Sequence, residues 1–466
     1  MSDHFINRHG SEFLFFSLLL LLFSVQIVFA SASFIQYMLL PMLACFFIFS
    51  FRLSPIFTSL AYVATVWLLY VVYGFYSSLS GGLSIYPGYT HFVGFVHVLP
   101  FILLPLVVYR ISLGTSLAFY FFYIAFVLSV SLFKSDVKTT AVVVRNLCLF
   151  FTAFVIGSYC LIPDEARKSF LYCVLGMLFI IVAFVFLDSF GVEFWTVWFD
   201  SAFVSALKNA ATFDNGMISN KWSYNSGIMI YRLSSIFFEP HHFGQLSAFF
   251  SVLSWSFYES SRKNKLIFLA LSVLFFLFCM LSFVKTAWMM LVVSYMTYFL
   301  LHKLYRPGRI KSVLFLLLYC FIGYFLVSAY MLLGIADTAS THLDAMLLSF
   351  QLNNFSEYLI GIGTVGSGYH AGVNAHESFS VLQSDSGLST IVLSVGFIGL
   401  SGFFYLILLV VKQVGFAQKI NRACSSVVLG WFSIIPFVSS GFSPVVVFPL
   451  FFTAGLCCRS WYVREN

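Results

Sequence analysis

Long apolar runs recur along the whole chain, and they constrain the fold more than any other feature of the sequence. Phe, Leu, Val and Ile fill stretches of roughly 17 to 25 residues, the length that a helical membrane crossing requires. Of the 466 residues, 61% are hydrophobic and 9% are charged, too few charges to cover the surface of a soluble protein of this size. The sequence therefore predicts an all-α, polytopic transmembrane helical protein whose residues 1–466 form a single integral membrane domain.

About fourteen membrane spans are expected, with twelve or thirteen as alternatives. The last apolar run, 427–458, is too long for one crossing, and Pro436, Gly441 and Pro444 can divide it into two short spans. The nine cysteines lie in apolar runs or on short basic connectors, so we expect free thiols. The other expected spans are 13–30, 34–51, 56–74, 91–109, 111–133, 139–162, 169–190, 237–258, 266–283, 284–301, 312–334 and 389–411.

The lysine and arginine residues indicate the orientation, because short cytoplasmic loops carry an excess of both. Seventeen lie in connectors on one side and five on the other. Both chain termini are therefore predicted to be cytoplasmic, and the net charge of +7 reports topology rather than a nucleic-acid partner. The seventeen are Arg8, Arg52, Arg110, Arg167, Lys168, Arg262, Lys263, Lys265, Lys303, Arg306, Arg309, Lys311, Lys412, Lys419, Arg422, Arg459 and Arg464. The five are Lys134, Lys138, Lys208, Lys221 and Arg232.

Two long loops, 191–236 and 335–388, are periplasmic in this topology, so the chemistry should face outward. Apolar residues keep helical spacing over 192–207 in the first loop and over 343–350 in the second. This spacing predicts amphipathic helices that lie in the membrane interface. The second loop also contains five acidic residues and neither Lys nor Arg.

Four places carry polar side chains within the membrane or near its boundary. Inserting a charged residue there costs roughly 2.5 to 3.5 kcal/mol, so each such residue is a candidate for function. The first begins at Arg232, which would share a face with Glu239 if the segment were helical, and Pro240 suits the first turn of a helix. An ion pair that braces the loop would explain both charges. The alternative is a guanidinium that binds phosphate beside a carboxylate that accepts a proton. His241 and His242 follow directly and are further candidates.

The second and third places lie at other outer ends of spans. Lys285, in the turn between two closely spaced spans, can bind phosphate as a point charge or reach toward the outer lipid headgroups. The end of the second long loop carries His376, Glu377 and Asp385. His376 can transfer protons near neutral pH or can stabilise the loop.

The fourth place is Arg145, about one third of the way along its expected span. An arginine at that depth needs a partner, which Asp136, Asp188 or a lipid phosphate could supply. A substrate diphosphate is the functional alternative.

Two patterns resemble a cofactor site and a metal site without the context that either needs. Gly361-Ile-Gly363-Thr-Val-Gly366 spells a dinucleotide fingerprint, but it follows no soluble strand and opens no βαβ unit. Histidines near carboxylates lack the tight ligand spacing of a catalytic metal site. We therefore expect neither a cofactor nor a metal.

Together these motifs resemble the O-antigen polymerase and ligase superfamily of inner-membrane proteins. The resemblance covers about residues 139–411, in organisation more than in identity, and the Glu-Pro pair favours the polymerase (Wzy-type) branch. The motifs are Arg232 with the following Phe-Glu239-Pro240, the hairpin Ser282-Phe-Val-Lys285-Thr286-Ala-Trp288, His376 eleven residues before Gly387, and Gly396-Phe-Ile-Gly399.

The resemblance implies a GT-C-like, metal-independent glycosyltransferase of lipopolysaccharide biosynthesis, located in the bacterial cell inner membrane. Members of the family polymerise polyprenyl (undecaprenyl) diphosphate-linked oligosaccharide repeats at the periplasmic face. Membrane lipids and a chain-length regulator protein are further expected partners. In this interpretation Glu239, His376 or Asp385 accepts a proton from the acceptor hydroxyl. The cations that hold the substrate diphosphate are Arg232, Lys285 and Arg145.

The sequence departs from the family pattern at three points. Lys285 stands where many relatives have arginine, and Glu377 stands where ligases often have asparagine. The second long loop also lacks arginine altogether. We therefore do not expect paired arginines from the two loops to bind the phosphates in this chain.

Two alternative functions differ in class or in acceptor. An O-antigen ligase would use the same chemistry but transfer the chain to a lipid A core. A flippase or other transporter of lipid-linked oligosaccharides would instead place charges near the bilayer midplane. Loss of a polymerase leaves single repeats on the core, loss of a ligase leaves long chains on the lipid carrier, and loss of a flippase leaves repeats facing inward.

Overall fold

The structure is a computed structural model of the chain, and within the part that it describes the protein is nearly all helical. That part contains thirteen α-helices, two short 3-10 helices and one two-stranded sheet. The amphipathic helices expected at 192–207 and 343–350 lie outside the described residues. The described residues are 17, 35–80, 86–108, 115–135, 137–160, 162, 167–189, 222–225, 228–237, 239–304, 352, 354–363, 386–416 and 418–460.

The helices coincide with the expected spans wherever both can be compared, with ends that differ by a few residues. The first half of the chain contains α2 (Ile35–Leu53), α3 (Pro55–Ser80), α4 (Tyr86–Val108), α5 (Thr115–Lys134), α6 (Val137–Tyr159) and α7 (Arg167–Ser189). The second half contains α10 (Pro240–Ser260), α11 (Lys265–Leu281), α12 (Lys285–Leu304), α15 (Phe355–Ile360), α17 (Gly387–Val414), α18 (Lys419–Ile434) and α19 (Pro444–Ser460).

Four helices in the described part of the chain are long and apolar enough to cross a membrane. They are Ser116–Lys134, Thr139–Tyr159, Ser169–Ser189 and Gly387–Val414, which belong to α5, α6, α7 and α17. Five shorter apolar helices accompany them. The helical membrane character is thus supported, whereas fourteen crossings and a GT-C arrangement stay predictions.

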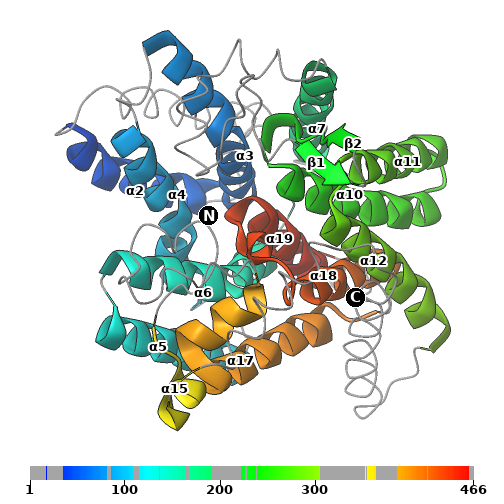
Figure 1. Ribbon diagram of the computed structural model, residues 1–466. Helices are drawn as coiled ribbons and strands as arrows, with labels where there is room; N and C mark the ends of the chain where they lie inside the picture. Colours follow the sequence, from blue (N-terminus) through cyan, green and yellow to red (C-terminus); the bar gives the residue numbers. More distant parts are fainter. Residues whose placement is uncertain are drawn as a thin grey trace.

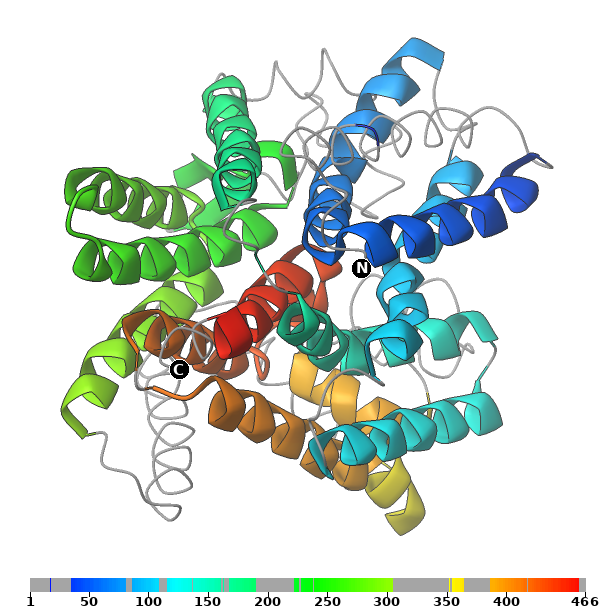
Figure 2. The ribbon, with the colours of Figure 1, turned by 180° about the vertical axis from the view of Figure 1, so that it is seen from behind.

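The last apolar run forms a broken helix pair at the centre of the structure. α18 ends at Ile434, a turn with the 3-10 helix η6 (Ser439–Phe442) follows, and α19 begins at Pro444, as the prolines and the glycine predict. Trp431 is fully buried and donates from Nε1 to the Gly441 carbonyl at 2.8 Å, which ties the turn to α18. α19 packs against α6, and α18 packs against α10 and α12. Figure 1 shows this pair surrounded by the other helices, and Figure 2 shows the same from behind.

α17 is interrupted by Gly396, whose φ of 64° and ψ of −168° are not helical. The segment that follows α15 packs against this interruption. The amide of Ile362 donates to the Leu393 carbonyl at 2.7 Å, and the amide of Gly363 donates to the Ser394 carbonyl at 3.2 Å. A helix break leaves such carbonyls without their helical partners, so the segment after α15 satisfies them.

Gly361 and Gly363, the two described glycines of the dinucleotide-like pattern, have a packing role. A Cβ atom on Gly361 would lie 2.5 Å from the backbone nitrogen of Val395, and one on Gly363 would lie 2.6 Å from the Lys134 Cβ. Both glycines have positive φ, 76° and 74°. Lys134 also donates from Nζ to the Gly361 carbonyl at 2.6 Å. These two glycines therefore allow close contact between α5, the segment after α15, and α17.

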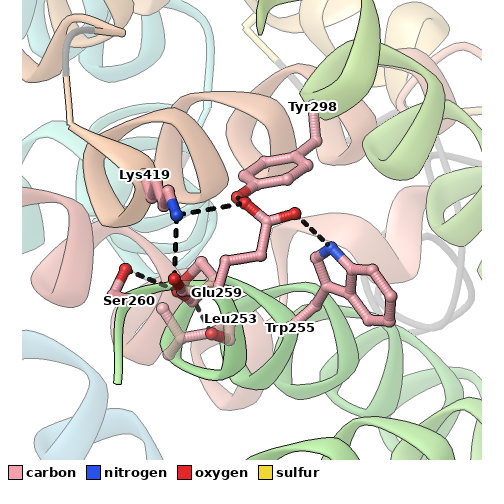
Figure 3. Close-up of polar contacts among 7 residues, drawn as sticks. Leu253, Trp255, Glu259, Ser260, Tyr298 and Lys419 are labelled. Carbon is pink, nitrogen blue, oxygen red and sulfur yellow. Dashed lines mark hydrogen bonds and ion pairs between the residues drawn. The ribbon is translucent and has the colours of Figure 1, made fainter. Parts of the chain in front are cut away.

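Glu259, in the last turn of α10, joins three helices (Figure 3). Trp255 donates from Nε1 to Oε1 at 3.0 Å, and the Tyr298 hydroxyl of α12 donates to Oε2 at 2.8 Å. Lys419 of α18 donates from Nζ to the Glu259 carbonyl at 2.8 Å and lies 4.0 Å from Oε2. Cations at the start of a helix are unfavourable, and α18 begins with Lys419 and Arg422. The Glu259 carboxylate offsets this cost.

Candidate functional site

The candidate site lies at the start of α10, where Glu239 precedes Pro240. Proline suits the first helical position because its missing N–H would have no helical partner there, and the structure confirms Pro240 at this place. Glu239 is the N-cap residue, with extended backbone. Oε2 of Glu239 lies 3.0 Å from Nε2 of His242, one helical turn further on. The Glu239 side chain is 21% exposed and that of His242 only 5%, so Glu239 is the member of the pair that faces outward.

Arg232 follows a β-hairpin rather than lying in a helix. Strands β1 (Trp222–Asn225) and β2 (Ile228–Tyr231) pair antiparallel, with Trp222 opposite Tyr231. A short 3-10 helix, η4 (Ser235–Phe237), then leads to Glu239. The expectation that Arg232 and Glu239 share a helical face is therefore wrong, because the segment between them is not an α-helix and contains the 3-10 turn of η4.

The Arg232 side chain is half-buried, and this environment changes its titration. Burial lowers the pKa of the guanidinium to about 10, because partial removal of water disfavours the charged form. The charge is nevertheless retained at neutral pH. A cation with incomplete hydration gains more from a nearby anion than a fully hydrated one does, which suits a phosphate-binding role.

Asp188, the penultimate residue of α7, fixes the chain on both sides of Arg232. Its Oδ1 accepts from the Tyr231 hydroxyl at 2.8 Å. Its Oδ2 accepts from the backbone amides of Ser234 at 2.5 Å and Ser235 at 3.0 Å. The Asp188 side chain is completely buried. These hydrogen bonds offset the free energy that is lost when its carboxylate is removed from water.

The hairpin between α11 and α12 packs directly against the start of α10. A Cβ atom on Gly244 would lie 2.7 Å from the Ala287 Cβ, so the two helices approach closely at small residues. Trp288 donates from Nε1 to the Cys279 carbonyl at 3.1 Å and closes the hairpin. Lys285 is exposed at the first residue of α12. Two motifs that lie about forty residues apart in the sequence are therefore neighbours in the fold.

A backbone hydrogen bond joins the Arg232 segment to the same hairpin. The amide of Leu233 donates to the carbonyl of Leu281, the last residue of α11, at 3.3 Å. Arg232, Lys285 and the Glu239–His242 pair thus belong to three connected pieces of structure. Such a site offers two cations and a carboxylate paired with an imidazole at one end of the bundle.

Arg145 lies elsewhere, within α6. It donates from NH1 to Nδ1 of His97 on α4 at 3.0 Å, and from Nε and NH2 to Oδ1 of Asn146 at 3.0 and 2.8 Å. Because arginine only donates, Nδ1 of His97 is the acceptor. His97 was not among the predicted partners, and Asp188, which was, binds the segment around Arg232.

Of the remaining predicted residues, one lies in the described part of the chain and three lie outside it. His241 lies beside His242 in the first turn of α10 and is half-buried. His376, Glu377 and Asp385 lie outside the described residues. Directly after them, Ser386 caps α17 and donates from Oγ to the Pro436 carbonyl at 2.6 Å.

Asp188 and the β-hairpin are features that the sequence reasoning missed. The signals were present, since an acidic residue at the end of an apolar span needs a specific partner, and an Asn-Ser-Gly turn between alternating residues is typical of a hairpin. Asp188 was considered only as a partner of Arg145. Its role depends on Tyr231 and Ser234, some forty residues later in the chain.

The described residues contain no group of three or more His, Cys, Asp or Glu side chains that could hold a metal ion. The eight cysteines among them are free thiols in the structure. Comparisons of the chain with models of known protein families, with curated proteins and with solved structures found no match.

Proposed function

We propose that the chain is a polysaccharide polymerase of the O-antigen (Wzy) type, a glycosyltransferase that acts on polyprenyl diphosphate-linked oligosaccharides. The observation that carries the proposal is the pairing of Glu239 with His242 at the start of α10, next to the segment of Arg232 and the hairpin of Lys285. Transfer from a lipid diphosphate needs cations for the departing diphosphate and a base for the acceptor hydroxyl. These residues offer both.

In the proposed reaction, a hydroxyl of the incoming lipid-linked repeat attacks the anomeric carbon of the donor chain. The new glycosidic C–O bond forms as the bond between that carbon and the diphosphate oxygen breaks. Glu239, the outward-facing member of the pair, accepts the hydroxyl proton, and His242 orients its carboxylate. Arg232 and Lys285 stabilise the negative charge on the departing polyprenyl diphosphate. His376 and Asp385 remain alternative bases.

The proposed setting is the bacterial inner membrane, with the site at the periplasmic face and both termini in the cytoplasm. The excess of lysine and arginine on one side supports this orientation. The partners are then undecaprenyl diphosphate-linked repeats, membrane lipids and a chain-length regulator protein. A ligase would differ only in its acceptor, a lipid A core.

A transporter of lipid-linked oligosaccharides is the second candidate, and Arg145 favours it. The contact between Arg145 and His97 joins two helices well inside α6 and α4, where charged residues often line a transport path. The site at the start of α10 has no evident use in such a protein. Enzymatic bond formation therefore separates the two functions.

The test uses purified protein with donor and acceptor lipid-linked repeats in detergent or liposomes, without added metal. Wild-type protein should convert single repeats into longer lipid-linked chains, and Glu239→Gln should lose this activity. Glu357→Gln is the matched control, since it makes the same charge change on α15, away from the site. Unchanged polymer length from Glu239→Gln would refute Glu239 as the base and leave His376 and Asp385 as candidates. Flipping of repeats without any new glycosidic bond would refute the polymerase function.

A further inference from the structure

The strongest unassigned feature outside the catalytic pair is the contact between Asp188 and the chain around Arg232. Asp188 accepts hydrogen bonds from Tyr231 on one side of Arg232 and from Ser234 and Ser235 on the other. A fourth contact comes from the Ser234 hydroxyl to Oδ2 at 3.4 Å. One fully buried carboxylate thus holds the residues that flank the arginine.

The local backbone explains why this carboxylate is needed. Ser235 has a φ of 51°, a left-handed conformation that costs a residue other than glycine about 1 kcal/mol or more. The first amides of the 3-10 helix η4 (Ser235–Phe237) also have no partner within the helix. Asp188 accepts from Ser235 and the preceding amide, and the Ser235 hydroxyl donates to the Ile181 carbonyl at 2.7 Å. α7 therefore stabilises a turn that would otherwise be strained.

We propose that Asp188 is a positioning residue that sets the direction of the Arg232 guanidinium toward the substrate diphosphate. This inference rests on the proposed function, because it gives the phosphate role to Arg232. Asp188 itself is completely buried and does not touch the substrate. It acts through the backbone of residues 231–235, to which its oxygens bind.

The chain also offers variants that separate positioning from folding. Asp188→Asn keeps the size of the side chain but replaces one acceptor oxygen by a donor group, so at most part of the set of bonds survives. Tyr231→Phe removes only the bond to Oδ1. Ser189→Ala is the matched control, because the Ser189 hydroxyl bonds within α7, to the Phe186 carbonyl at 2.6 Å.

The activity test is a double-mutant cycle between Asp188 and Arg232. Asp188→Asn should raise the KM for the lipid diphosphate donor by about tenfold or more, with a smaller change in kcat, and Tyr231→Phe should have a lesser effect in the same direction. If Asp188 acts through Arg232, adding Asp188→Asn to Arg232→Ala should change the rate by no more than about twofold. If the rate of the double mutant were reduced by the product of the two single-mutant factors, the inference would be overturned.

Hydrogen exchange of residues 231–237 in the purified proteins gives a readout independent of activity. Asp188→Asn should speed exchange of the Ser234 and Ser235 amides, and Ser189→Ala should not. If exchange is faster in Asp188→Asn but Arg232→Ala is fully active, Asp188 still holds the turn in place, whereas the phosphate-binding role of Arg232 in the proposed function is refuted. Unchanged exchange in Asp188→Asn would refute the positioning itself.

Discussion

Gly244 of α10 lies so close to Ser282 that a Cβ atom on the glycine would stand 2.5 Å from the serine Oγ. Ser282 cannot easily move away, because its Oγ donates to the Cys279 carbonyl at 2.7 Å. The absence of a side chain at Gly244 therefore sets the distance between the Glu239–His242 pair and the hairpin that carries Lys285.

Gly244→Ala is predicted to destabilise the protein and to reduce activity. The added methyl group would force α10 and the hairpin apart, and overpacking of this kind costs about 1–3 kcal/mol. Gly176→Ala on α7 is the control, since a Cβ atom there meets nothing within 4 Å and alanine favours a helix by up to about 1 kcal/mol over glycine. Thermal unfolding in detergent should show opposite shifts for the two variants. Equal stability of both would mean that the hairpin can move freely.

Glu259→Ala is predicted to weaken the junction of α10, α12 and α18. Both Trp255 and the almost fully buried Tyr298 would lose an acceptor, and each unsatisfied buried donor costs roughly 1–3 kcal/mol. Lys419→Ala should cost less than about 1 kcal/mol, because the Lys419 side chain is 45% exposed and the ion pair is long. Urea or thermal unfolding of the two variants tests the order. A larger loss from Lys419→Ala would contradict it.

Topology can be tested with reporter fusions at two positions. The distribution of lysine and arginine predicts that Ser340 lies in the periplasm and Gly308 in the cytoplasm. Alkaline phosphatase fused after Ser340 should be active, and the fusion after Gly308 should be inactive. The reverse result would place the site at the cytoplasmic face and exclude a periplasmic polymerase.

Much of the helical fold could be predicted from the sequence, because the length of an apolar run and the positions of its prolines determine where a helix begins and ends without any distant contact. The division of the apolar run 427–458 near Pro436 and Pro444 could be predicted because the run is longer than one membrane span. The docking of Gly361 and Gly363 into the break at Gly396 could not be predicted in this way. It depends on carbonyls that only a distant helix break exposes.

Several residues of the candidate site could be predicted from the sequence, but Asp188 and the pairings between side chains could not. Pro240 indicated the start of a helix, and the spacing of Glu239 and His242 along that helix follows from it. The seven-residue spacing of Arg232 and Glu239 suggested a shared face that does not exist, because the positive φ at Ser235 and the 3-10 turn interrupt the chain. That turn depends on Asp188, whose contribution comes from another helix.

Glu239 and His242 should respond differently to substitution if Glu239 is the base. Glu239→Gln should lower kcat by about 100-fold to 10,000-fold, the usual value of general-base assistance, with binding of donor largely retained. His242→Gln should cost less, because glutamine can still donate one hydrogen bond to the carboxylate. Single-turnover rates with lipid-linked repeats measure both, with Glu357→Gln as the control for loss of charge. A larger loss from His242→Gln would make His242 the base.

Arg232→Lys is predicted to make activity sensitive to moderately alkaline pH. Burial lowers the pKa of Arg232 from 12.5 to about 10, so the wild-type cation is fully present at neutral pH and is lost only as the pH rises through about 10. The same loss of hydration would lower the pKa of a lysine ammonium at this position below its ordinary value of about 10.4.

The substituted protein should therefore bind the diphosphate donor weakly at pH 7, because lysine lacks the planar fork of arginine. It should lose the remaining binding over a moderately alkaline range, below the pH of about 10 at which wild type loses its cation. Since the charged form is the binding form, KM should rise with pH in Arg232→Lys and stay level in wild type over the same range. Arg262→Lys, in the exposed connector between α10 and α11, is the matched control and should follow the wild-type profile. A flat KM profile for Arg232→Lys, parallel to that of the control, would show that the charge at position 232 does not contact the diphosphate.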